Sequence, residues 1–280
     1  MKKDLKQLLE EKYPIKPLHG HGARAYKKDC ARLRSGEPLA YVIGSQPFLG
    51  LTIYLDSHPL IPRPETEWWT ELLLSMLVDS PAGEFSVALR AARPSLTTEN
   101  SPAGSLEHEH GALRFLDLCA GSGAIGCAAL ARLPNAEVYF CEIEPAHEAT
   151  IVKNIRENNL DASRAHVCIG DLFEPSGDMK FDIIAANPPY IPDSRELPES
   201  VSHYEPALAL RAGKDGLDAI RRIAAKLPQH LTENGKAWIE CDNAHAIAAR
   251  SLFETRKFKA EILADHYGRP RIIFVKRNPA

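Results

Sequence analysis

The amino-acid sequence predicts an α/β protein whose core is a doubly wound, largely parallel sheet. Three observations support this fold class. From Leu113 onward, short apolar segments alternate with segments of helical periodicity, as in a parallel sheet covered by helices on both faces. The first apolar segment continues into a glycine turn, Gly121-Ser122-Gly123, and then into a helix. The last two, 258–265 and 271–277, have no helix between them and predict an antiparallel pair at the sheet edge.

The N-terminal residues predict two short helices followed by a hairpin. Residues 3–12 and 24–34 have helical periodicity. The segments 39–44 and 49–55 are apolar and rich in residues that favour strands, and we expect them to pair as a β-hairpin.

A third helix is expected from Glu65 to Val78, because prolines precede it and its apolar residues recur at the helical period. In residues 79–111, Pro, Gly, Ser, Thr, Glu and His dominate, and we expect most of this stretch to be a mobile insertion at the surface. The chain is thus divided into a shortened N-terminal helical segment (1–36), a β-hairpin linker (37–64) and a main domain (65–280).

The remaining elements of the main domain follow in a regular order. Before the terminal pair, strands are expected at 113–119, 136–142, 165–170, 181–187 and 235–240. Helices are expected at 124–133, 146–158, 216–231 and 244–256. Ligands of such a sheet bind at the carboxyl ends of the strands, so the residues that follow each strand are the candidate site residues.

Composition and charge narrow the class of protein. The chain has 280 residues, of which 44% are hydrophobic and 25% charged, which fits one large α/β domain with a small appendage. A net charge of −3 disfavours a nucleic-acid substrate, because proteins that bind the phosphate backbone are usually basic. The N-terminus has no apolar signal core, and no stretch approaches transmembrane length. We expect a cytoplasmic monomer with no membrane partner.

The cysteines predict neither disulfides nor a metal site. No pair has C-x-x-C spacing, and no histidine lies at zinc-finger spacing. We therefore expect reduced thiols, mostly in the core. The six residues are Cys30, Cys119, Cys127, Cys141, Cys168 and Cys241.

The glycine turn predicts a cofactor site. Gly121 and Gly123 allow the backbone to turn tightly and to approach a ligand. Glu142 ends the next strand, where an acid accepts hydrogen bonds from both ribose hydroxyls; Glu144 is the alternative acid. Asp171, after the third strand, is expected to accept a hydrogen bond from an adenine amino group.

Two cofactor classes compete for this turn. A dinucleotide is one, and S-adenosylmethionine is the other. Asp117 precedes the turn and suits a cationic ligand, a sulfonium with its amino group, better than a diphosphate. We therefore expect S-adenosylmethionine, with the turn residues Cys119, Ala120, Gly121, Ser122 and Gly123 lining its site.

An unusual loop, Asn187-Pro188-Pro189-Tyr190, follows the apolar strand at 181–187 and reaches the same sheet edge. The Asn187 side-chain oxygen and the Pro188 carbonyl can accept the two N–H bonds of a planar NH₂ group. The prolines fix the loop, and Tyr190 can pack against the flat group. The loop therefore predicts methyl transfer to an amide or amino nitrogen, mainly by positioning. Asn187, Pro188 and Tyr190 are the expected catalytic residues.

With these motifs, the sequence resembles the release-factor glutamine methyltransferase family, the HemK-like proteins. The resemblance runs from about Ala31 to the C-terminus and includes "GEPLAYVIGSQPFLG", "LIPRPETE", "LDLCAGSGAIG", "GDLFE", "NPPYIP", "YEPALAL", "GKDGLDAIRRI" and "GRPRIIFV". It implies a class I S-adenosylmethionine-dependent methyltransferase with a Rossmann-like, seven-stranded sheet. It also implies that the substrate is the glutamine side-chain amide in the Gly-Gly-Gln loop of peptide chain release factors.

The resemblance also implies roles for particular residues. The substrate glutamine is expected to contact the loop Asn187, Pro188, Pro189 and Tyr190. S-adenosylmethionine is expected to contact Gly121, Gly123, Glu142, Asp171, Leu172 and Asn187.

The sequence departs from the family pattern in three places. Cys119 replaces the first glycine of the cofactor loop, a change that we expect to be tolerated because a thiol is small. The N-terminal helical segment is shorter than the family's, and the resemblance implies that this segment helps to dock the release factor. The 79–111 insertion is longer than the usual connection.

Three other functions compete with this interpretation. A nucleobase amino-methyltransferase shares Asn-Pro-Pro-Tyr but needs a basic groove, which the acidic, Ser- and Glu-rich insertion does not offer. A ribosomal-protein glutamine methyltransferase differs just after the Pro-Arg of "IPRPETE". A binding protein without activity would not need both Glu142 and Asn187.

Several further residues allow two interpretations. We expect Trp68 and Trp69 to pack in the core and rim rather than to stack on substrate. Arg63 and Glu65 either orient the substrate or cofactor or form a salt-bridged turn, and Tyr204-Glu205-Pro206 is expected to shape the far wall of the site. His108 and His110 flank Glu109 in what we expect to be a solvated loop rather than a metal site.

Overall fold

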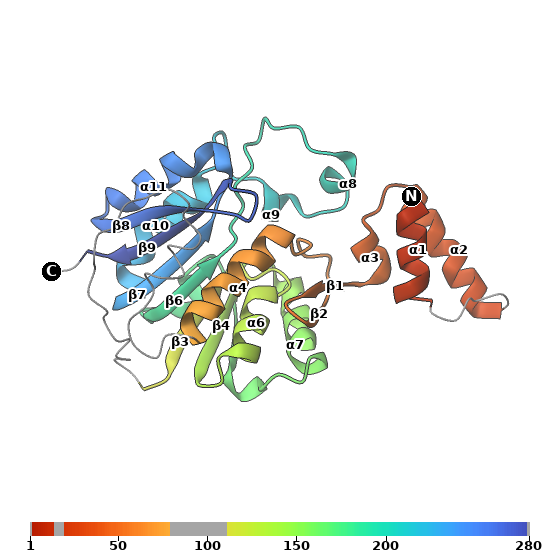
Figure 1. The fold of residues 1–280 in the computed structure, drawn as a ribbon, viewed down its shortest axis with the longest axis horizontal. Coiled ribbons are helices and arrows are strands. Elements are labelled where there is room, and N and C mark those ends of the chain that lie inside the picture. Colours follow the sequence, from red (N-terminus) through yellow and green to blue (C-terminus); the bar gives the residue numbers. More distant parts are fainter. Residues whose placement is uncertain (1, 14–19, 79–110, 279–280) are drawn as a thin grey trace.

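The computed structural model describes residues 2–13, 20–78 and 111–278 and has the expected α/β architecture (Figure 1). Its central sheet has the strand order β5-β4-β3-β6-β7-β9-β8. β9 runs antiparallel to both β7 and β8, and the other neighbouring pairs are parallel, so the terminal antiparallel pair is confirmed. The strands are β3 (Leu113–Leu118), β4 (Ala136–Glu142), β5 (Ala165–Ile169), β6 (Phe181–Ala186), β7 (Leu231–Glu240), β8 (Phe258–Ala264) and β9 (Pro270–Arg277).

Helices cover both faces of this sheet, which explains why a central strand such as β6 is buried along its whole length. All six residues of β6 are buried. One face packs against α4 (Pro64–Val78), α6 (Ala124–Arg132) and α7 (Glu148–Glu157), and the other against α10 (Asp218–His230) and α11 (Ala246–Glu254) (Figure 1). The expected helices and strands of the main domain are therefore confirmed, with bounds that differ by a few residues.

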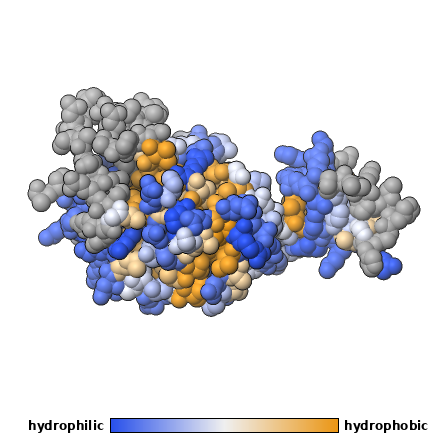
Figure 2. All heavy atoms as spheres, turned by 90° about the horizontal axis from the view of Figure 1, so that it is seen from below, coloured by the Kyte–Doolittle hydropathy of each residue, from blue (hydrophilic) through white to orange (hydrophobic). Residues whose placement is uncertain are grey.

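The N-terminal helices form a small core of their own. α1 (Lys2–Glu11) and α2 (Gly20–Arg34) contribute Leu8 and Cys30 to it, and both residues are buried together with Val42. On the face drawn in Figure 2, this part of the chain carries mostly hydrophilic residues, whereas apolar residues are more frequent on the larger body.

The strand expected at 39–44 is wrong. These residues form a short helix, α3 (Leu39–Ile43), that begins after Pro38 and ends at Gly44, whose φ of 98° is left-handed. The Gly44 N–H donates to the Ala40 carbonyl at 2.8 Å and closes the turn. A single helical turn buries Ala40, Tyr41 and Val42 together, so packing overrides the strand propensity of these residues.

The hairpin itself exists, but its first strand lies at other residues than expected. Its strands are β1 (Ser45–Phe48) and β2 (Leu51–Tyr54), so the residues expected to form the turn form the first strand instead. Two short helices between β6 and α10 were also not expected, α8 (Glu199–Ser202) and α9 (Ala207–Leu210).

The described residues do not test two of the expectations from the sequence. Residues 79–110 of the expected insertion, with His108, Glu109 and His110, lie outside the described residues. The division of the chain at residues 36 and 64 stays a prediction. None of the helices in the described ranges combines the length and apolarity that crossing a membrane requires.

Candidate active site

The candidate site lies where the strand order of the sheet reverses. β3 is followed by β4 and β5 on one side and by β6 and β7 on the other, so the carboxyl ends of β3 and β6 meet at a topological switch point. Open α/β sheets bind ligands in the crevice outside this point. The predicted cofactor turn follows β3, and the Asn-Pro-Pro-Tyr loop follows β6, so the two predicted motifs adjoin.

The turn after β3 is built from left-handed backbone. Cys119, Gly121 and Gly123 have φ values of 63°, 56° and 77°. The Gly123 N–H donates to the Ala120 carbonyl at 2.7 Å, and the Ala120 N–H donates to the Cys141 carbonyl of β4 at 3.1 Å. Glycine adopts such a conformation without steric cost, whereas Cys119 adopts it at a steric cost because it has a Cβ atom.

Asp117 lies at the base of the turn, and its side chain is fully buried. Its Oδ2 accepts the Gly126 N–H of α6 at 2.8 Å, and its Oδ1 has no hydrogen-bond partner among the described residues. Burial raises the pKa of this carboxyl to about 8, against which the Gly126 N–H acts. A positively charged ligand close by would stabilise the ionised form of this carboxyl.

Glu142 ends β4 beside the turn and is almost fully buried. Its Oε2 accepts the Gly121 N–H at 2.7 Å, and its Oε1 accepts the Glu144 N–H at 2.9 Å. The carboxylate is thereby fixed, while each oxygen keeps a further lone pair for a ligand hydroxyl. The Glu144 side chain instead accepts the Ala146 N–H at 3.3 Å, in its own turn.

Asp171 and Leu172 follow β5 at the same edge. Leu172 has a left-handed φ of 50°, as a sharp turn requires. The Asp171 carboxylate forms an ion pair with Arg222 of α10. Arg222 therefore holds one oxygen of the acid that was expected to contact adenine, and no sequence pattern indicated this partner.

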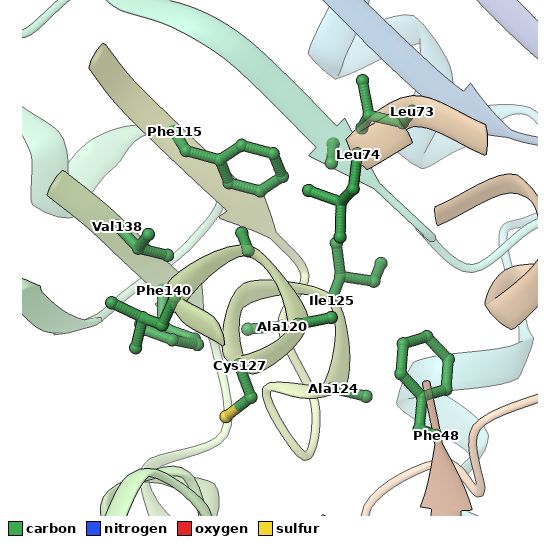
Figure 3. Close-up of a cluster of buried hydrophobic side chains, with 14 of the residues drawn as sticks. Phe48, Leu73, Leu74, Phe115, Ala120, Ala124, Ile125, Cys127, Val138 and Phe140 are labelled. Carbon is green, nitrogen blue, oxygen red and sulfur yellow. The ribbon is translucent and has the colours of Figure 1, made fainter. Parts of the chain in front are cut away.

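A tightly packed cluster supports the turn from below. Figure 3 shows Phe140 of β4 against α6 and Phe48 of β1 beside Ala124 at the start of that helix. A Cβ atom at Gly126 would lie 2.2 Å from Phe140 Cε1, so only glycine allows α6 to pack this closely on β4. Packing thus explains why residue 126 is a glycine.

Asn154 joins the hairpin to the turn. This fully buried residue of α7 accepts the Tyr54 N–H of β2 at 2.7 Å through Oδ1. Its Nδ2 donates to the Ser122 carbonyl at 2.9 Å. The hairpin is therefore attached to the cofactor turn through one side chain.

The loop after β6 contacts α4 and the end of β7. Asn187 Nδ2 donates to Thr66 Oγ1 at 3.1 Å, and the Thr66 hydroxyl donates to Glu240 Oε2 at 2.7 Å. Trp69 Nε1 donates to the same oxygen at 2.8 Å, and the Tyr190 hydroxyl donates to Glu240 Oε1 at 3.0 Å. The buried Glu240 carboxylate thus connects three elements that the sequence separates widely.

This burial changes the acid–base properties of the cluster. It raises the pKa of Glu240, whereas the hydrogen bonds from its three donors lower it. Burial also raises the pKa of Tyr190 well above its usual value. Tyr190 therefore keeps its proton and donates a hydrogen bond to Glu240.

Two further contacts fix the backbone of this loop. Gly216 has a φ of 74°, and a Cβ atom there would lie 2.5 Å from the Tyr190 carbonyl oxygen. The Arg211 guanidinium donates to the Pro192 carbonyl at 2.8 Å and to the Arg195 carbonyl at 2.7 Å. The last glycine of the "GKDG" motif therefore lets its backbone pack directly against the loop after β6.

The Arg63 side chain forms a salt bridge, one of its two expected roles. Its Nη2 lies 2.5 Å from Glu205 Oε1, and the Ile61 N–H donates to Glu205 Oε2 at 3.3 Å. The Tyr204 hydroxyl donates to the Ser35 carbonyl at 2.9 Å. Tyr204 and Glu205 therefore connect the segment before α4 and the end of α2 to the loop after β6.

The structure thus brings most of the predicted residues to one sheet edge and adds several that the sequence analysis missed. Trp69 is fully buried and stacks near Trp238, as expected for a packing role. The described residues contain no group of three or more His, Cys, Asp or Glu side chains arranged to hold a metal ion. The missed residues are Thr66, Asn154, Arg222 and Glu240.

The comparisons with known proteins agree with this geometry. A domain family described as "Methyltransferase small domain" matches residues 104–203. A release factor glutamine methyltransferase of Geobacter sulfurreducens is 34% identical over 245 residues, which cover 87% of this chain and 74% of that protein. A ribosomal protein uL3 glutamine methyltransferase of Bradyrhizobium diazoefficiens is 34% identical over 207 residues, covering 73% of this chain and 57% of that protein.

A solved structure supports the fold alone. The catalytic domain of hMettl16, in complex with the MAT2A 3′UTR hairpin 6, has a TM-score of 0.52 and 15% sequence identity over 82% of this chain and 77% of its own. The expected class I methyltransferase fold and enzyme class are confirmed, and with them S-adenosylmethionine as the cofactor. The chain belongs to the release factor glutamine methyltransferase family.

Proposed function

We propose that this protein methylates the side-chain amide nitrogen of the glutamine in the Gly-Gly-Gln motif of peptide chain release factors. The observation that carries the proposal is the fixed carboxamide of Asn187 at the switch point, in a chain that is 34% identical to a release factor glutamine methyltransferase. Its Nδ2 is bound to Thr66, so its oxygen is left to accept a hydrogen bond from a substrate N–H.

The residues around the turn fit S-adenosylmethionine. Glu142 would accept the ribose hydroxyls through the lone pairs that its two backbone donors leave, and the positive charge of the ligand would stabilise the ionised form of Asp117. Cys119, Ala120, Gly121, Ser122 and Gly123 would line the rest of the site, with Asp171 and Leu172 beside the base and Asn187 near the methyl group. When bound, the cofactor supplies a sulfonium methyl group that the substrate nitrogen accepts as it loses a proton to solvent, leaving a thioether.

The protein's own contribution is positioning. An amide nitrogen is a weak nucleophile because its lone pair is delocalised into the carbonyl group. Asn187 Oδ1 and the Pro188 carbonyl would each accept one of its N–H bonds, and Pro189 and Tyr190 would enclose the flat amide group. Holding the nitrogen in line with the methyl donor reduces the entropic part of the barrier, and the two acceptors stabilise positive charge that develops on the nitrogen.

The setting of this activity is also proposed. Release factors act in translation, so the protein would work in the cytoplasm, on a protein substrate rather than on nucleic acid, and as a monomer. The uL3 relative supports a second candidate, a glutamine of a ribosomal protein, which the same amide site would accept. We favour the release factor because the relative with that name matches more of its own length, 74% against 57%.

A methyl-transfer assay separates these candidates. Purified protein and labelled S-adenosylmethionine are offered a release factor, a ribosomal uL3 protein and DNA in parallel reactions. We expect label in the release factor, and none when its Gly-Gly-Gln glutamine is replaced by glutamate. Label in uL3 alone would select the second candidate, and label in DNA would reject both.

A further inference from the structure

Glu240 is a fully buried carboxylate that neither predicted motif contains. It ends β7, is 1% exposed, and accepts hydrogen bonds from Thr66, Trp69 and Tyr190. A buried acid is costly unless its oxygens are satisfied, and here three donors converge on two oxygens. Its location directly behind the acceptor loop requires an explanation beyond packing.

The direction of the hydrogen bonds supplies that explanation. Three donors converge on the two oxygens of Glu240, so the group acts as an acceptor only, and the Thr66 hydroxyl donates its single proton to it. The Thr66 oxygen then has only lone pairs to offer to Asn187. The carboxamide of Asn187 can meet them only with its NH₂ group, as observed at 3.1 Å. Its oxygen is consequently turned away from Thr66.

We infer that Thr66 and Glu240 are positioning residues that fix which end of the Asn187 carboxamide faces the substrate amide. The two ends of a carboxamide have nearly the same shape, so without such a partner Asn187 can rotate and present its NH₂ group instead. An NH₂ group there would repel the N–H bonds of a substrate amide. This inference rests on the proposed amide chemistry and extends it to residues on α4 and β7.

Tyr190 is oriented by the same carboxylate. Its hydroxyl donates to Glu240 Oε1, so towards any other partner it offers only lone pairs. Glu240 therefore leaves both polar side chains of the loop, Asn187 and Tyr190, with hydrogen-bond acceptors to offer to a ligand. A site with acceptors alone selects an NH₂ group over a carboxylate or carbonyl oxygen, which has no proton to donate.

The test compares Thr66→Val with Thr66→Ser. Valine has nearly the shape of threonine but no hydroxyl, whereas serine keeps the hydroxyl. We expect Thr66→Val to lower kcat for methyl transfer by about 10–100-fold, the effect of losing a partner that orients a ligand-binding group. KM for the methyl donor should change much less than kcat, because the turn after β3 and Glu142 stay intact. Thr66→Ser should restore most of kcat.

A second measurement does not depend on activity. The side-chain amide resonances of Asn187, assigned by their absence in Asn187→Ala, should move in Thr66→Val and stay in place in Thr66→Ser. If wild type methylates no glutamine, the proposed function fails, yet the resonances still test the contact. Unchanged Asn187 resonances in a folded Thr66→Val protein, or a kcat equal to wild type, would overturn the inference.

Discussion

The site has two halves, the turn after β3 with Glu142 (the cofactor half) and the loop after β6 with its partners (the acceptor half), and different contacts hold each of them in place. Over β3 and β4, the cofactor half is a backbone turn closed by residues that are near in sequence: Asp117 binds Gly126 nine positions away and Glu142 binds Gly121 at a separation of 21. Over β6 and β7, the acceptor half depends on side chains that are far apart. Asn187 and Thr66 are 121 positions apart, and Thr66 and Glu240 are 174 apart.

From this difference we expect the two halves to have separate tasks, cofactor binding and methyl transfer. In the cofactor half, the groups that face a ligand are backbone N–H groups and two acids, and the backbone fixes the direction of its own N–H groups. The acceptor half presents side-chain atoms whose orientation depends on their partners. Substitutions in the first half should therefore act on cofactor affinity, and substitutions in the second half on the rate of transfer.

The largest expected effect separates the halves. Asn187→Ala should lower kcat by about 10²–10³-fold, the range for removing one group that stabilises charge in a transition state. Affinity for S-adenosylmethionine should change little, because the turn and Glu142 stay intact. Calorimetry and steady-state kinetics on the same preparation measure both quantities. A parallel loss of affinity and rate would show that the halves are not separable.

Glu142→Ala should have the opposite signature. It removes the acceptor of the Gly121 and Glu144 N–H groups as well as the proposed ribose contact. We expect cofactor binding to weaken by about 1–3 kcal/mol, the scale for a lost hydrogen bond to a charged group. Glu144→Ala is the matched control and should bind normally. Unchanged calorimetric affinity of Glu142→Ala would move the ribose contact to another residue.

Asp117 should make the stability of the ligand-free protein depend on pH. Its pKa is about 8 in the folded protein, against an ordinary value of 3.8, so between these values the folded state binds more protons than the unfolded state. Its contribution to the free energy of unfolding therefore falls as pH rises from about 4 to about 8. In Asp117→Asn this contribution disappears, so its melting temperature should fall less over that range. Identical pH profiles of the two proteins would contradict the raised pKa of Asp117.

The smallest effect is expected at Cys119. Its φ of 63° costs about 1 kcal/mol for a residue with a side chain, and Cys119→Gly relieves it while making the unfolded chain more flexible. The two changes nearly cancel, so the free energy of unfolding should move by less than about 1 kcal/mol. Cys119→Val should destabilise the protein clearly, because a β-branched residue is an outlier there. Denaturant unfolding of both variants provides the comparison.

What could be predicted from the sequence follows the same division. The glycine turn, Asp117, Glu142 and the strand–helix alternation are local patterns, and the structure places them at the sheet edge where they were expected, whereas their contacts with the cofactor stay a prediction. Glu240 carried no such signal, because a glutamate at a strand end has an ordinary role until the fold gives it partners. Thr66 stands in the quoted segment "LIPRPETE", but nothing in the sequence gave it a role before the fold brought it to Glu240. Residues 39–44 show the reverse error: their local strand propensity was clear, but burial in α3 decided their conformation.

The most direct test of the proposed chemistry is to locate the transferred methyl group. A release factor is incubated with this protein and S-adenosylmethionine, and its Gly-Gly-Gln peptide is sequenced by tandem mass spectrometry. We expect one added methyl group on the glutamine side-chain nitrogen with the wild-type protein, and a strongly reduced amount with Asn187→Ala. A methyl group on another residue, or equal methylation by the two proteins, would contradict the role given to the acceptor half.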